Sequence, residues 1–156
     1  MPEFLRRTFP ARFDNHFPGT PIAFYAFVLI AVATTMRSLI HLAAPDGGAQ
    51  SIATIPLASY STGAAGTVIG IFSLWGLSQT IIAALYWLAI LRYRALIPLF
   101  YLLLVVEYAG RMAIGHTRVV ETVSTAPGSV INLPLVVVCS ALYGLSVSGA
   151  QATPPD

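Results

Sequence analysis

The chain has 156 residues, of which 56 % are hydrophobic and only 9 % are charged. Soluble domains carry about 25 % charged residues, so this composition excludes an ordinary soluble protein and indicates a membrane protein of one domain. The formal net charge of +2 is too small to indicate a nucleic-acid partner, and a single cysteine, Cys139, excludes a thiol-relay enzyme that uses its own cysteine pair.

The first 21 residues carry Arg6, Arg7 and Arg12 among four phenylalanines. This combination predicts a basic aromatic segment that lies on the membrane surface, broken at Pro10. A cleaved signal peptide is the alternative, but the apolar run begins only at Ile22 and is too long for a typical one. We therefore expect residues 1–21 to remain as an interfacial segment.

Four apolar stretches follow, each close to or above the roughly 20 residues that a membrane-spanning helix needs. Their predicted ranges are about 22–44, 63–91, 96–115 and 129–149. Pro21 is placed to begin the first, and Ser129 is a predicted N-cap of the fourth. The sequence therefore predicts an all-α, antiparallel four-helix transmembrane bundle over residues 22–149, followed by a disordered tail over residues 150–156.

The arginines predict the orientation of this bundle. Arg92 and Arg94 join the second and third spans and share one side with the three arginines of residues 1–21, whereas Arg118 is the only loop arginine on the other side. Positively charged loops stay in the cytoplasm. We expect both termini in the cytoplasm and the protein in a bacterial inner membrane.

Charged residues inside the spans give the best functional pointer. Arg37 and His41 lie one turn apart near the outer end of the first span, and Glu107 and Arg111 lie one turn apart in the third, at a similar predicted depth. Hydrocarbon disfavours lone charges, so these side chains must pair or bind something. With Asp46 in the loop between the first two spans, they predict a polar pocket for a ligand or partner.

Two interpretations of this cluster remain open. In the first interpretation, Glu107 and Arg111 form a purely structural pair and Arg37 extends towards the lipid headgroups. In the other, the excess arginine holds an anion such as a phosphate or carboxylate, or a quinone-like carbonyl. The apolar stretch from Ser51 to Leu57 is expected to fold over the mouth of the bundle as a lid.

Metal and cofactor sites have weak support. His41 and His116 lie at one predicted depth and are weak candidates for haem or pigment ligands, but no set of cysteines and histidines has zinc spacing. The sequence requires no cofactor, and we expect lipid as a bound ligand.

Small residues recur at four-residue spacing in two spans, as Gly66 and Gly70 in the second and Ser140 and Gly144 in the fourth. Such residues let helices approach closely. We favour packing inside this bundle, and contact with another chain is the alternative. Gln79 and Asn132 are expected to hydrogen-bond between helices, and Trp75 either packs inside or faces lipid.

Several of these features resemble the small four-helix bacterial membrane proteins called DoxX-like. The matching residues are Arg37, Pro45, Gly66, Gly70, Arg92, Arg94 and the pair Gly110-Arg111. Many members of that family have no established activity. The resemblance therefore implies the four-helix fold rather than a function.

Three functions remain as hypotheses. The leading one is a non-catalytic accessory or scaffolding subunit of a larger membrane complex, whose partners are lipids and other transmembrane chains or further copies of itself. The alternative is a binder or carrier of a lipid, an anion or a quinone-like molecule. An enzyme that uses Glu107 or His41 as acid or base is the third and least favoured, because the chain has no recognisable catalytic set.

Overall fold

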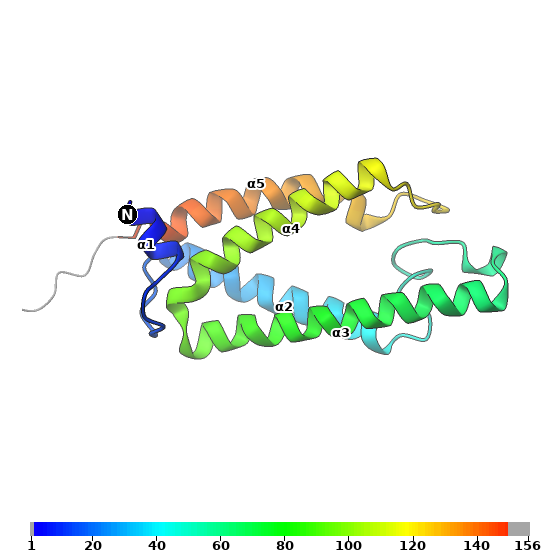
Figure 1. Cartoon of the computed structure of the whole chain (residues 1–156), viewed down its shortest axis with the longest axis horizontal. Coiled ribbons are helices and arrows are strands. Elements are labelled where there is room, and N and C mark those ends of the chain that lie inside the picture. Colours follow the sequence, from blue (N-terminus) through cyan, green and yellow to red (C-terminus); the bar gives the residue numbers. More distant parts are fainter. Residues whose placement is uncertain (1, 150–156) are drawn as a thin grey trace, which may run out of the picture.

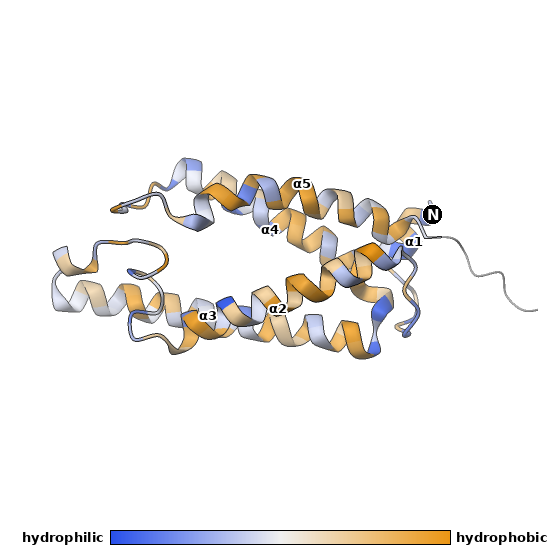
Figure 2. Cartoon of the chain, turned by 180° about the vertical axis from the view of Figure 1, so that it is seen from behind, coloured by the Kyte–Doolittle hydropathy of each residue, from blue (hydrophilic) through white to orange (hydrophobic). Residues whose placement is uncertain are grey.

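The computed structural model describes residues 2–149, and in this part of the chain it contains four long helices. Each is long and apolar enough to cross a membrane (Figures 1 and 2). The helices are α2 (Pro21–Ala43), α3 (Thr62–Arg92), α4 (Ile97–Thr117) and α5 (Pro127–Val147). The shorter elements are α1 (Glu3–Thr8), η1 (Leu57–Ser59) and η2 (Arg94–Leu96). These elements confirm the predicted all-α four-helix bundle and identify a small multi-pass membrane protein. The tail predicted for residues 150–156 lies outside the described residues.

Local chemistry explains most helix ends. Pro21 occupies the first turn of α2, where its missing N–H costs nothing. The side chain of Ser61 accepts a hydrogen bond from the N–H of Ala64 and caps α3. The predicted N-cap at Ser129 is wrong. Helix α5 begins at Pro127, two residues earlier, and the Ser129 hydroxyl donates to the Ala126 carbonyl at 2.7 Å.

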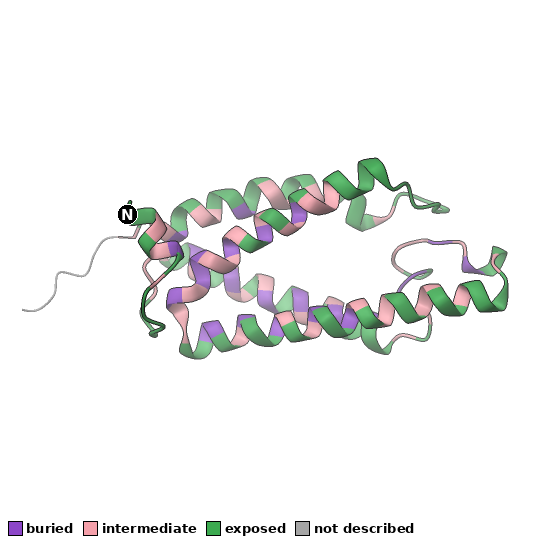
Figure 3. Cartoon of the chain, in the orientation of Figure 1, coloured by how far each residue is buried: buried purple, intermediate pink, exposed green. Residues whose placement is uncertain are grey.

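The four helices form two antiparallel pairs, α2 with α3 and α4 with α5, which meet most closely near the amino terminus (Figure 1). We call this region the closed end. Its core holds aromatic and small side chains from all four helices, and the Tyr101 hydroxyl donates to the Ala23 carbonyl at 2.7 Å. Buried residues gather in this half of the bundle, as Figure 3 shows. The core is formed by Ala23, Phe27, Ala31, Tyr86, Ala89, Ile90, Ile97, Tyr101, Leu104, Tyr108 and Cys139.

The residue that brings α2 and α3 together is Gly76. A Cβ at Gly76 would lie 2.6 Å from the backbone nitrogen of Leu42 and 2.7 Å from the carbonyl carbon of His41. The two backbones therefore touch at this position, as small residues permit in membrane helices.

The small residues that we expected to pack inside the bundle do not do so. Gly66, Gly70, Ser140 and Gly144 are all exposed, and a Cβ at any of these three glycines would meet no atom within 4 Å. The favoured intramolecular packing is thus wrong for these positions, because the faces that carry them point away from the neighbouring helices. Contact with another chain remains the interpretation for this set.

The amino-terminal segment is attached to the closed end. Arg7 donates from Nη1 to the carbonyls of Val147 and Gly149, at 2.9 and 2.7 Å, and so satisfies carbonyls at the end of α5. The hydroxyls of Thr8 and Tyr143 lie 2.7 Å apart. Phe4, Phe9 and Phe13 are exposed around this contact. The segment is therefore held by the bundle, where Phe17 packs against the core, while these three rings remain free to contact lipid.

The opposite end of the molecule, which we call the open end, is formed by two loops. Residues 44–61 connect α2 to α3 and fold back on the first turns of α3, where Ala49, Ile55 and Leu57 are buried. Residues 118–126 connect α4 to α5. The helix pairs are separated at this end, and the loops lie across the space between them (Figure 1).

Candidate functional site

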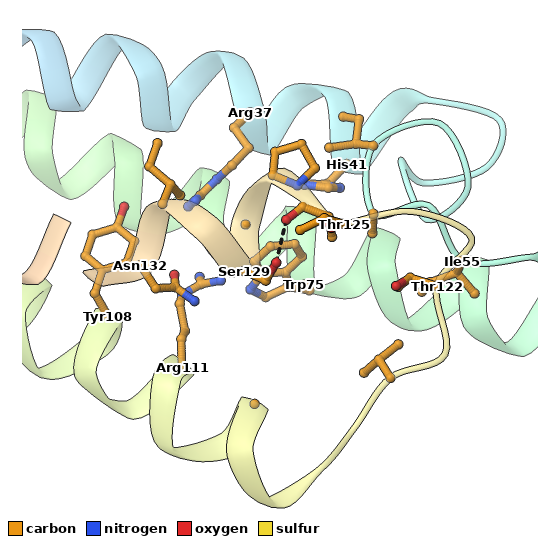
Figure 4. Close-up of a pocket in the computed structure, with 18 of the residues that line it drawn as sticks. Arg37, His41, Ile55, Trp75, Tyr108, Arg111, Thr122, Thr125, Ser129 and Asn132 are labelled. Atoms are coloured by element: carbon orange, nitrogen blue, oxygen red, sulfur yellow. Dashed lines mark hydrogen bonds between the residues drawn. The ribbon is translucent and has the colours of Figure 1, made fainter. Parts of the chain in front are cut away.

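A cavity of about 1100 Å³ lies between the two helix pairs towards the open end. All four long helices and both loops contribute to its wall, which is mostly apolar in its area. Sites for small molecules span about 300–1000 Å³, so this space is large enough for a drug-sized ligand or for a lipid head with part of its chain. Figure 4 shows the polar side chains that point into it.

Arg37 enters the cavity from α2. Its Nη2 donates to Oε1 of Gln79 on α3 at 2.9 Å, which confirms the expected interhelical hydrogen bond of Gln79. Its Nε is buried and has no hydrogen-bond partner among the described residues. An unpaired guanidinium N–H in a buried setting is costly, so this atom offers a strong donor to any anion that reaches it.

Arg111 enters from α4, on the opposite side of the same space (Figure 4). The indole of Trp75 from α3 contacts both arginines, with ring-to-guanidinium distances of 5.0 Å for Arg111 and 5.7 Å for Arg37. Aromatic faces attract such cations. Trp75 therefore packs inside and holds two like charges at the cavity wall.

Glu107 neutralises Arg111 rather than Arg37. Its Oε1 accepts from Nε of Arg111 at 3.1 Å and also from Nη2, one turn along the same helix. The sequence left this pairing open. Glu107 is not part of the cavity wall, so its carboxylate supports Arg111 from behind and leaves the remaining guanidinium surface available.

His41 is buried in the wall, and its Nδ1 lies 2.8 Å from the carbonyl oxygen of Gly47. A carbonyl only accepts, so Nδ1 carries the proton of this hydrogen bond. Gly48 has φ +74°, and a Cβ there would lie 2.7 Å from His41 Nδ1. The loop can approach the imidazole only because this residue is glycine. His116, by contrast, is exposed and does not line the cavity.

Asp46 lies in the loop and not in the cavity wall. Its carboxylate accepts from the backbone N–H groups of Gly48, Gln50 and Ser51, at 2.9, 3.1 and 2.7 Å. The hydrogen bonds from Ser51, above all, and from Gly48 favour the ionised form and lower the pKa of Asp46 to about 2. Asp46 therefore stabilises the turn that covers His41.

The two loops are joined to each other at the mouth of the cavity. The Thr54 hydroxyl donates to the Ser124 carbonyl at 2.7 Å, and the Val123 N–H donates to the Thr54 carbonyl at 2.8 Å. Thr54 has φ +58°, an unusual conformation for a β-branched residue. Ile52 and Ile55 line the cavity beside this contact, in the stretch that we expected to fold over the mouth. We call these two hydrogen bonds the loop clasp.

The cavity wall is strongly cationic. Arg37, Arg111 and Arg118 all contribute to it, and no aspartate or glutamate among residues 2–149 does. Three guanidinium charges less the one carboxylate of Glu107 leave an excess of two positive charges. Arg118 is exposed, as is Glu121 in the same loop, but Glu121 does not line the cavity, and Asp46 is held by its own turn.

Sequence reasoning brought Arg37, His41 and Arg111 to one site, and the structure places all three in its wall. It missed Arg118 and the beginning of α5, which also line the cavity. The signal for them was weak, because the loop before α5 is polar like any other loop. Asn132 lines the cavity as well, as Figure 4 shows.

Comparisons of this chain with family models, with curated proteins and with solved structures give no match. The site must therefore be interpreted from its own geometry.

Proposed function

We propose that this membrane protein binds an anionic molecule with an apolar part, and holds the anionic group between the two helix pairs. The observation that carries the proposal is the position of Arg37 and Arg111 on opposite sides of one largely apolar cavity. Partly buried cations within a membrane-spanning bundle are retained where they meet a partner of opposite charge.

Several contacts fit a binding site better than a purely structural role. Arg37 keeps a buried Nε without a partner, although Gln79 already satisfies another nitrogen of its guanidinium. Glu107 takes up only the charge of Arg111. An anion in the cavity would provide the missing acceptor, and the apolar wall would bury the rest of the molecule.

The test is a titration that uses Trp75 as its reporter. The chain has two tryptophans, so Trp87→Phe leaves Trp75 as the only indole. We expect dodecyl phosphate or dodecanoate to change its fluorescence at concentrations at least tenfold below those needed for the neutral dodecanol. Arg37→Gln and Arg111→Gln should each remove this preference for the anion.

Arg92→Gln is the matched control, because Arg92 is exposed at the closed end, away from the cavity. It removes the same charge and should leave the titration unchanged. Equal affinity for the anions and for dodecanol, or full binding in the Arg37 and Arg111 variants, would exclude the proposed function.

A second candidate is the accessory or scaffolding subunit, and it is favoured by one separate observation. Gly66 and Gly70 on α3, and Ser140 and Gly144 on α5, form exposed strips of small residues that no part of the described chain covers. If they contact other transmembrane chains, extraction in mild detergent should recover stable partners, and Gly70→Ile should release them. Recovery of the protein only as a monomer or homo-oligomer would exclude this candidate.

A further inference from the structure

We infer that the anionic group in the cavity is a phosphate with two negative charges, carried as the monoester head of a lipid-soluble molecule. This inference rests on the proposed function and makes its ligand more specific. Its first support is charge. The wall has an excess of two positive charges after Glu107 is counted, which a phosphate monoester balances and a single carboxylate does not.

The second support is the number and direction of the donors. A carboxylate has two oxygens and is satisfied by one bidentate arginine, whereas a phosphate monoester presents three strong acceptor oxygens. The wall offers Arg37 from α2 and Arg111 from α4, on opposite sides, with Arg118 after the end of α4. Donors from several sides suit a tetrahedral head better than a planar one.

The third support is the amino-terminal end of α5, which forms part of the same wall through Pro127, Gly128 and Ser129. No side chain caps this end of the helix. Pro127 has no N–H group and the Ser129 N–H already donates to the Ala126 carbonyl at 3.0 Å, so the helix dipole, rather than a set of free N–H groups, favours a negative charge here. Here the helix end adds to three arginines in a cavity and does not stand alone.

Hydroxyl groups complete the arrangement. The cavity wall includes Thr122, Thr125 and Ser129, although the Ser129 hydroxyl already donates to the Ala126 carbonyl (Figure 4). Below them the wall is apolar, with Ile30, Ile131 and Leu135. The site thus combines many donors with apolar surface, and both features are needed for a phosphate-headed amphiphile.

The experiment compares three probes on the full chain in dodecyl maltoside, with Trp75 as the reporter in the Trp87→Phe background. The probes are dodecyl phosphate, dodecanoate and inorganic phosphate, with neutral dodecanol as the reference. We expect dodecyl phosphate to bind at least tenfold more tightly than dodecanoate at pH 8, where the monoester is fully charged. Arg118→Gln should reduce this ratio to below threefold, and it should weaken dodecanoate little.

Each outcome has a distinct meaning. Equal affinity for dodecyl phosphate and dodecanoate, with both above dodecanol, overturns the phosphate assignment and leaves the proposed function intact. Failure of every anion to exceed dodecanol overturns both. Inorganic phosphate that binds as tightly as dodecyl phosphate supports the phosphate chemistry but identifies the free ion as the ligand, which contradicts a lipid source. A ratio that Arg118→Gln and Arg92→Gln leave equally unchanged overturns the phosphate assignment, because the second excess positive charge depends on Arg118.

Discussion

Arg37 on α2 and Gln79 on α3 are joined by a 2.9 Å hydrogen bond, which ties a cation of the cavity wall to a neutral partner on another helix. The amide oxygen satisfies one guanidinium nitrogen without neutralising the charge. The charge therefore stays available to the cavity, while the side chain is held in position.

The first prediction concerns this hydrogen bond. Gln79→Leu should lower the free energy of unfolding by about 1 kcal/mol, the magnitude typical of hydrogen bonds between membrane helices. It should also weaken anion binding, since Arg37 loses its support. Thermal unfolding in detergent and the Trp75 titration measure the two effects. Ser78→Ala is the control, because the Ser78 hydroxyl bonds only within its own helix; an equal effect in both variants would contradict the prediction.

The second prediction uses the same substitution at two glycines of α3. Gly76→Ala should destabilise the protein by about 1–3 kcal/mol, because the new methyl group would overlap the backbone of α2 at Leu42. Gly70→Ala should be neutral or stabilising, since nothing lies within 4 Å of the added carbon and alanine is the better helix former. Melting temperatures in one detergent compare the pair directly, and similar values would refute the close approach of α2 and α3.

The third prediction concerns the loop clasp. Thr54→Val removes the hydroxyl that donates to the Ser124 carbonyl but keeps the shape of the side chain. We expect it to open the mouth of the cavity more often, so a cysteine placed at Asn132 should react with a water-soluble maleimide several-fold faster. Thr67→Val is the control, because the Thr67 hydroxyl bonds within α3. Unchanged reaction rates would show that the clasp does not limit access.

The fourth prediction concerns acid. The pKa of Asp46 is lowered to about 2 by backbone N–H groups, so its carboxylate contributes stability above its ordinary pKa near 3.8. This contribution is lost as the pH falls from about 4 towards 2, because the unfolded chain takes up a proton in this range and the folded protein does not. Asp46→Asn should remove that part of the acid dependence in unfolding experiments at pH 2–5. An identical pH profile in the variant would contradict it.

The fifth prediction concerns orientation, which the arginine distribution predicts and the structure leaves untested. Arg92→Cys should react with an impermeant maleimide only after cells are opened, whereas Val123→Cys should react in intact cells. Cys139 is buried and should contribute little background. The reverse labelling pattern would place the termini on the outer side.

Hydropathy was sufficient to predict the four long helices, with ends that differ from the structure by two residues or fewer. It predicted less well which faces meet. Gly66 and Gly70 have the spacing of a packing motif, yet the contact is made by Gly76, which is a single glycine on a different face. Spacing identifies residues that share a face, but only the neighbouring helix decides whether that face is inside.

The candidate site, like the fold, could be predicted from the sequence only in part. The cost of charge in hydrocarbon was enough to bring Arg37 and Arg111 to one cavity. It was not enough to choose the partner of Glu107, because its own helix and the neighbouring one were equally reachable. Trp75 and Arg118 were not assigned to the site from the sequence, because an indole in an apolar span and an arginine in a loop have many ordinary roles.

The unequal packing of the two ends has a mechanical consequence. The aromatic core near the amino terminus fastens the two helix pairs together, while the far ends are joined by the two hydrogen bonds at Thr54. Spreading those far ends would break few bonds and leave the core unstrained. A ligand can therefore enter the cavity at a free-energy cost much smaller than that of unfolding the protein.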